Sequence, residues 1–199
     1  MSSGQLAANN EQPGTGNGLN AKILLAGFGG QGVLFAGKFF ANIGLFSGRE
    51  VSWLPSYGPE MRGGTANCGV ILSESPVGSP IVTKPDILVA LNMPSLDKFE
   101  HTVVPGGHIF IDNSLVEPAA ARDGVTAHAL PAAKLAEENG LQGLANMIMA
   151  GGVLAVLGAT DAGIIESAMK KTVPERKKAL FEANMRAVGM GLEQLTANN

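Results

Sequence analysis

The sequence predicts an α/β protein, a three-layer sandwich with a mostly parallel β-sheet and helices on both faces. Short apolar runs that stop at glycine or proline alternate with stretches of helical periodicity, a pattern typical of parallel strands joined by crossover helices. Hydrophobic residues make up 45% of the chain and charged residues 16%, which supports a full core. The 199 residues suit one domain. We place it at residues 21–195, between polar tails at 1–20 and 196–199 that we expect to be disordered.

The strands are predicted from apolar runs that are bounded by turn residues. The first, at residues 22–26, stops at a glycine-rich loop, and a mainly apolar helix at 33–46 follows it. Continuous apolar runs of this kind are typical of strands that are buried on both faces of a sheet. The remaining predicted strands cover residues 50–54, 66–72, 86–91, 108–111 and, at an edge of the sheet, 125–129.

The other helices are predicted from capping residues and from apolar spacing. Ser95 can cap a short helix that runs to residue 100, and Asp161 can cap a helix at 162–170. Pro174 fits the first turn of a helix that runs to residue 195. Two more helices are expected at residues 132–139 and 143–157. In the last helix an apolar stripe at three- and four-residue spacing predicts packing on the sheet or on a partner; its members are Phe181, Met185, Val188, Leu192 and Leu195.

Charge and cysteine content exclude several classes of protein. The net charge of -3 leaves no basic surplus to neutralise phosphates, so we expect no nucleic-acid partner. Cys68 is the single cysteine, which excludes an intrachain disulfide framework and a metal or iron–sulfur site built on cysteines of this chain alone. Its apolar strand predicts a buried, inert thiol, and the low cysteine content fits a reducing cytoplasm.

Several kinds of site and segment are not indicated by the sequence. No apolar stretch reaches about 18 residues, so we expect no transmembrane helix and no membrane partner, and no signal-peptide pattern opens the chain. His101, His108 and His128 show no paired metal-ligand spacing and are predicted to lie on the surface. No G-x-S-x-G elbow is present. We therefore assign no catalytic and no metal-binding residue.

A glycine loop follows the first predicted strand and precedes the first predicted helix. It matches the G-x-G-x-x-G pattern, in which backbone amides at a helix start can bind an anion. A nicotinamide site would need an acid at the end of the second strand, where Trp53 and Leu54 stand instead. A P-loop would need Ser or Thr where Phe39 follows Lys38. The loop thus predicts an anion cradle of unspecified ligand, with tight packing alone as the alternative. Its candidate residues are Gly27, Gly29, Gly30, Gln31 and Gly32.

A second loop, at residues 55–64, reads Pro-Ser-Tyr-Gly-Pro-Glu-Met-Arg-Gly-Gly. Arginine offers a planar fork of donors for phosphate or carboxylate, and paired glycines allow close approach of the backbone. Loops at the carboxyl ends of parallel strands line a common crevice, so this loop is expected beside the glycine loop. The alternative is a rigid surface turn with a contact between Glu60 and Arg62. The candidate residues are Ser56, Tyr57, Arg62, Gly63 and Gly64.

Taken in order, these motifs resemble the gamma subunit, or gamma domain, of the 2-oxoacid:ferredoxin oxidoreductases. The resemblance extends from about Lys22 to the last helix. The long Tyr-Gly-Pro-Glu-Met-Arg-Gly-Gly string is its most specific part. The segments that carry the resemblance are 27–33, 55–67, Ser79-Pro80, Pro85-Asp86, Pro105-Gly106-Gly107 and Asn146-Met147.

The resemblance implies a Rossmann-like domain near the active centre of an assembly, inactive alone and associated with coenzyme A. Such enzymes convert a 2-oxoacid, coenzyme A and oxidised ferredoxin to acyl-CoA, carbon dioxide and reduced ferredoxin. It also implies that alpha, beta and ferredoxin-like partner subunits hold thiamine diphosphate, magnesium and iron–sulfur clusters.

On this resemblance we expect residues 29–32 to contact phosphates of coenzyme A, while Ser56, Tyr57 and Arg62 face coenzyme A or a partner subunit. Two alternatives remain open. These loops are a pure subunit interface, or the chain is a stand-alone nucleotide-binding oxidoreductase or regulatory module.

Overall fold

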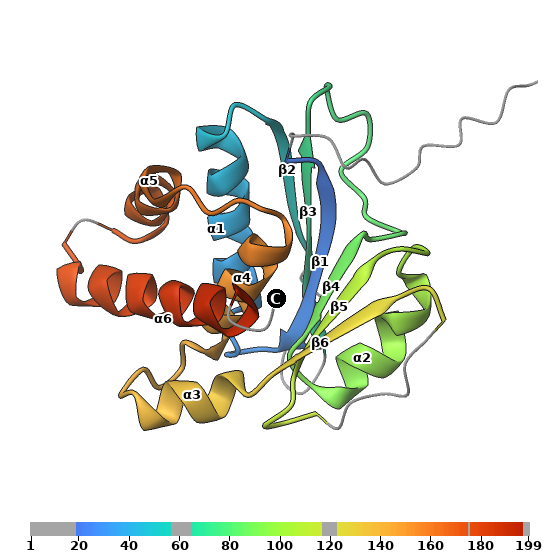
Figure 1. Ribbon diagram of the computed structural model, residues 1–199. Coiled ribbons are helices and arrows are strands. Elements are labelled where there is room, and N and C mark those ends of the chain that lie inside the picture. Colours follow the sequence, from blue (N-terminus) through green and yellow to red (C-terminus); the bar gives the residue numbers. More distant parts are fainter. Residues whose placement is uncertain (1–18, 57–64, 117–122, 175, 197–199) are drawn as a thin grey trace, which may run out of the picture.

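The computed structural model describes residues 19–56, 65–116, 123–174 and 176–196, and within them six strands form one sheet (Figure 1). The strand order is β2-β3-β1-β4-β5-β6. Strand β3 pairs antiparallel with both of its neighbours, whereas β1, β4, β5 and β6 pair in parallel. The strands are β1 (Ala21–Phe28), β2 (Glu50–Ser56), β3 (Thr65–Ser73), β4 (Ile87–Ala90), β5 (His108–Asp112) and β6 (Thr126–Leu130). The predicted α/β class and mostly parallel sheet are confirmed.

Helices lie on the two sides of this sheet in Figure 1, where α2 is separated by the strands from α1, α4, α5 and α6. Leu24 of β1 belongs to the core on the α2 side, while its neighbours Ile23 and Leu25 belong to the larger core. This alternation explains why the strand is continuously apolar from Ile23 to Ala26. The helices are α1 (Val33–Phe46), α2 (Met93–Phe99), α3 (Ala132–Glu138), α4 (Ala145–Val156), α5 (Ala162–Thr172) and α6 (Lys178–Thr196), with a 3-10 turn at Glu100–Thr102.

Two predicted helix starts are wrong. Asn92, not Ser95, caps α2, because its side-chain oxygen accepts a 2.9 Å hydrogen bond from the Ser95 amide, and Ser95 lies buried in the first turn. The last helix begins at Lys178 rather than at Pro174. The Pro174 carbonyl closes a separate turn with the Lys177 amide, and the Lys177 carbonyl accepts the first bonds of the helix. Proline is favoured in the first turn of a helix, but its presence alone does not establish that a helix starts there.

The predicted apolar stripe of the last helix packs against the core beside α4. Val188 is buried, and Phe181, Met185, Leu192 and Leu195 are partly buried there. Glycines bring the two helices into backbone contact, since a Cβ on Gly191 would overlap the Ile148 carbonyl and one on Gly151 the Val188 carbonyl. The small-residue content of α4 therefore serves helix packing.

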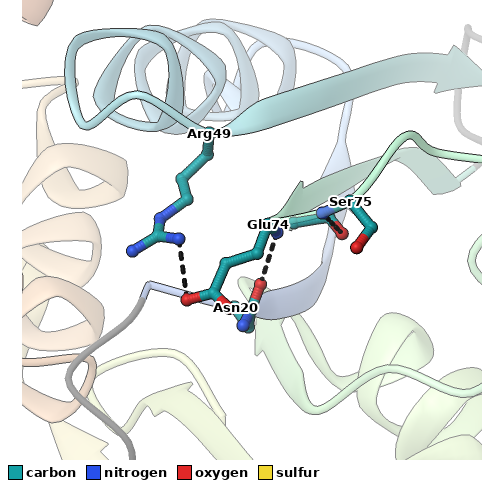
Figure 2. A network of polar contacts seen from close by, with 5 residues as sticks. Asn20, Arg49, Glu74 and Ser75 are labelled. Atoms are coloured by element: carbon teal, nitrogen blue, oxygen red, sulfur yellow. Dashed lines mark hydrogen bonds and ion pairs between the residues drawn. The ribbon is translucent and has the colours of Figure 1, made fainter.

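Polar contacts join the start of β2 to the end of β3 (Figure 2). Arg49 forms a 2.8 Å ion pair with Glu74, and the Glu74 amide donates to the Asn20 side chain at 2.9 Å. Leu19 also packs against the core. These contacts lie at the amino end of β1. The two predicted loops follow the carboxyl ends of β1 and β2, at the opposite edge of the sheet.

Candidate functional site

The glycine loop between β1 and α1 adopts a conformation that favours glycine. Gly30 and Gly32 have φ values of 97° and 75°, in the left-handed region that side chains disfavour. Gly32 is the N-cap of α1, and no described side chain accepts a hydrogen bond from the first amides of that helix. Amides that lack a side-chain cap among the described residues favour an anion at this point, as does the positive end of the helix dipole.

Gln31 anchors the loop instead of pointing a free amide at a ligand. Its side-chain oxygen accepts hydrogen bonds from the Phe28 amide at 2.6 Å and from the Asn92 side chain at 3.0 Å. Its side-chain nitrogen donates to the Leu91 carbonyl at 2.8 Å. A Cβ on Gly27 would come within 2.9 Å of the Gln31 side-chain oxygen. Gly27 therefore makes room for this anchor, which joins the glycine loop to the end of β4.

Asn146, in the first turn of α4, contacts the glycine loop and is not among the predicted site residues. Its side-chain nitrogen donates a 3.0 Å hydrogen bond to the Gly32 carbonyl, and a Cβ on Gly32 would overlap that nitrogen. The side chain is 4% exposed, and its oxygen has no partner among the described residues. The one signal in the sequence was that Asn146 belongs to the Asn-Met pair of the family resemblance. That resemblance assigned no role to the residue.

A cleft of about 350 Å³ opens beside the glycine loop, at the carboxyl ends of β1, β4 and β5. Asp112 contributes a buried carboxylate that accepts hydrogen bonds from the Ser114 and Ala133 amides at 3.1 and 2.9 Å. It thus caps α3, whose own N-cap is a proline. The cleft lies on the β4 side of the glycine loop, whereas β2, which leads into the second predicted loop, lies on the other side of β1. Its lining includes Gly30, Gln31, Leu91, Asp112, Glu137 and Asn146.

Comparison with known proteins identifies the family. The family model described as "Pyruvate ferredoxin/flavodoxin oxidoreductase" matches residues 22–194. The chain belongs to this family. Ketoisovalerate oxidoreductase subunit VorA of Methanothermobacter thermautotrophicus is 41% identical over 179 residues, which cover 89% of this chain. They cover 37% of VorA, so the chain spans little more than a third of that relative.

Solved structures agree with this assignment. The keto/oxoacid ferredoxin oxidoreductase gamma subunit from Geobacter sulfurreducens superposes with a TM-score of 0.75 at 29% identity, covering 88% of this chain and 98% of that one. A 2-oxoglutarate:ferredoxin oxidoreductase from Magnetococcus marinus gives a TM-score of 0.80 at 22% identity. The superposition covers 89% of this chain and 31% of that one. At this sequence identity the similarity shows a shared fold only. The predicted resemblance to a gamma subunit of the 2-oxoacid:ferredoxin oxidoreductases is confirmed.

The second predicted loop of this gamma subunit leaves the same edge of the sheet as the glycine loop. Ser56, the last residue of β2, pairs with Asn67 of β3, and Asn67 pairs with Ala26 of β1. The carboxyl ends of β1 and β2 therefore lie on one edge. The candidate residues Tyr57, Arg62, Gly63 and Gly64 lie outside the described residues, so their contacts stay a prediction.

Cys68 of the gamma subunit is a buried thiol, as predicted. It is fully buried beneath α1, and its Sγ lies 3.5 Å from the Val33 carbonyl oxygen. Burial raises the pKa of the thiol to about 12, against the opposing effect of a hydrogen bond with Trp53. The thiolate that redox or nucleophilic chemistry needs is thus disfavoured.

Two histidines depart from the predicted surface position. Nδ1 of His108 lies 3.0 Å from Nε2 of His128, and both side chains are half-buried. The parallel pairing of β5 with β6 brings together residues that lie 20 positions apart in the chain. Within the described part of the chain there is no group of three or more His, Cys, Asp or Glu side chains that could hold a metal, and no helix long and apolar enough to cross a membrane.

Proposed function

We propose that this gamma subunit completes a cytoplasmic 2-oxoacid:ferredoxin oxidoreductase and helps to bind coenzyme A. The complete enzyme would convert a 2-oxoacid, coenzyme A and oxidised ferredoxin to acyl-CoA, carbon dioxide and reduced ferredoxin. We also propose that the layered arrangement is Rossmann-like. The observation that carries the proposal is the start of α1, where two glycines with positive φ precede amides that no described side chain caps.

Coenzyme A suits this position by its charge. Its pyrophosphate and 3′-phosphate are anions that backbone amides at a helix start can bind. Residues 29–32 would contact a phosphate through the backbone, since the Gln31 side chain is already bonded to other groups. Ser56 ends β2 on the same edge. Arg62 and Tyr57, which follow it in the sequence, are the proposed side-chain contacts.

The chemistry of the oxidation would come from partner subunits. One cysteine per chain is too few to ligate an iron–sulfur cluster, and the pKa of that buried thiol is raised. Alpha, beta and ferredoxin-like partners would therefore hold thiamine diphosphate, magnesium and the clusters. This subunit would shape the coenzyme A site and would be inactive alone.

A second candidate function for the same loops is a pure subunit interface. Phe28 at the end of β1 and Leu54 near the end of β2 are 38% and 41% exposed. Large apolar side chains that stay exposed in an isolated chain favour burial by a partner. An interface role and a coenzyme A contact make different predictions for assembly and for KM.

Arg62→Ala in the complete purified enzyme tests the two candidates. If Arg62 binds a phosphate, we expect KM for coenzyme A to rise about tenfold or more, with KM for the 2-oxoacid and the subunit stoichiometry unchanged. Arg62→Lys is the matched variant, because it keeps the charge and loses the fork; its KM should rise less. Loss of subunits from the complex would favour the interface. An unchanged KM in an intact complex would exclude the contact with coenzyme A.

A further inference from the structure

The His108–His128 pair lies on parallel neighbouring strands, on the face of the sheet that carries the larger core. Phe110 pairs with His128 across β5 and β6, and His108 pairs with Thr126. The two histidines are therefore diagonal neighbours on one face. The His128 ring stacks on the fully buried Phe110 ring, with centroids 4.6 Å apart and planes 20° apart. This stacking fixes the plane of one imidazole and leaves the other beside it.

The two ring nitrogens that face each other are 3.0 Å apart. Metal–nitrogen bonds to imidazole are about 2.0–2.1 Å long. If a metal ion lay at that distance from both nitrogens, the nitrogen–metal–nitrogen angle would be close to a right angle. Right angles between neighbouring ligands are typical of square-planar and tetragonal sites, which copper(II) and nickel(II) prefer, rather than of the tetrahedral sites of zinc.

We propose that His108 and His128 form a chelating site for a square-planar or tetragonal divalent transition-metal ion, copper(II) or nickel(II). Both side chains are half-buried and hence reach water on one side, so water would complete the coordination. Phe110, on which the His128 ring stacks, belongs to the larger core. The site is independent of the proposed coenzyme A site, because it involves neither the glycine loop nor the cleft beside it.

Binding of the metal would shift one hydrogen within an imidazole ring and would release none. In the metal-free pair, one of the two facing nitrogens carries the hydrogen and the other accepts it. When both nitrogens coordinate the metal through their lone pairs, that hydrogen moves to the second nitrogen of the same ring. Each imidazole remains neutral and the metal keeps its charge, so no redox step is involved.

Titration of the full chain with copper(II) ion alone tests the site. We expect one copper per chain at pH 7.5, with an electron paramagnetic resonance spectrum that shows coupling to two imidazole nitrogens. His108→Gln and His128→Gln should each weaken binding at least tenfold and remove one coupled nitrogen. His101→Gln is the matched control, because His101 is the remaining histidine of the chain and is exposed; it should change nothing.

Two outcomes would overturn the proposal. The first is a wrong pattern of copper affinities: either the affinity of His108→Gln stays within twofold of that of the unsubstituted chain, or His101→Gln abolishes copper binding. The second needs no variant: a copper spectrum of the unsubstituted chain without two-nitrogen coupling. This second measurement decides the matter even if His128→Gln, which loses its stacking on Phe110, fails to fold.

Discussion

The side chain of Asn146 donates a 3.0 Å hydrogen bond to the carbonyl oxygen of Gly32, 114 residues earlier in the chain. This bond joins the first turn of α4 to the N-cap of α1. It holds the glycine loop from one side, while Gln31 holds it from the other through Leu91 and Asn92. The anion-binding conformation proposed for the loop therefore depends on residues far from it in sequence.

Asn146→Ala should lower the free energy of unfolding by about 1–3 kcal/mol, because it leaves the Gly32 carbonyl without its side-chain donor. Chemical denaturation measures this change. Asn139→Ala is the matched control. Asn139 also donates to a backbone carbonyl, at 2.9 Å, but it is exposed, so the change should stay within about 0.5 kcal/mol. Equal effects of the two substitutions would contradict the anchoring role of Asn146.

Gly30→Ala and Gly48→Ala form a matched pair that separates backbone strain from ligand binding. Both glycines have positive φ, and at both an added Cβ meets no described atom within 4 Å. Each substitution should therefore cost roughly 1–2 kcal/mol of stability. Gly48 lies beyond the other end of α1, so only Gly30→Ala should raise KM for coenzyme A in the complete enzyme. If the two variants bound coenzyme A equally well, the loop would not be the phosphate site.

Gly191→Ala should destabilise the fold by about 1–3 kcal/mol, because its Cβ would overlap the Ile148 carbonyl where α6 meets α4. Gly189→Ala, two residues earlier in the same helix, meets no described atom within 4 Å. Alanine favours a helix over glycine, so that variant should gain up to about 1 kcal/mol. Thermal unfolding of both variants measures the difference. A Gly191→Ala protein as stable as the unsubstituted one would disprove the close helix contact.

The histidine pair predicts how stability depends on pH. Burial lowers the pKa of His108 and His128 below the ordinary 6.5, and His108 lowers that of His128 further. Below about pH 6.5 the unfolded chain thus binds more protons than the folded one, so stability falls as the pH falls. Above that pH the titration of these two groups causes no further change in the free energy of unfolding. Denaturation at a series of pH values should show this slope reduced in His108→Gln and intact in His101→Gln.

Local pattern in the sequence was enough to predict much of the fold. Each of the six predicted strands overlaps an observed one, because short apolar runs with flanking glycine or proline and β-branched residues favour a strand over a helix. The glycine loop was predicted for the same local reason, because positive φ at Gly30 and Gly32 is a property of the backbone. The start of the last helix was predicted wrongly, as Pro174 makes a turn of its own before Lys178.

The sequence by itself determined the strands, the glycine loop and the family, because neighbouring residues encode them. Only the tertiary structure decided that Asn146 reaches Gly32, that the cleft opens toward β4 and β5, and that His108 meets His128. These contacts join residues from 20 to 114 positions apart. They depend on which strands become neighbours and which helix faces pack together, and the free energy that selects those neighbours comes from burial across the whole chain.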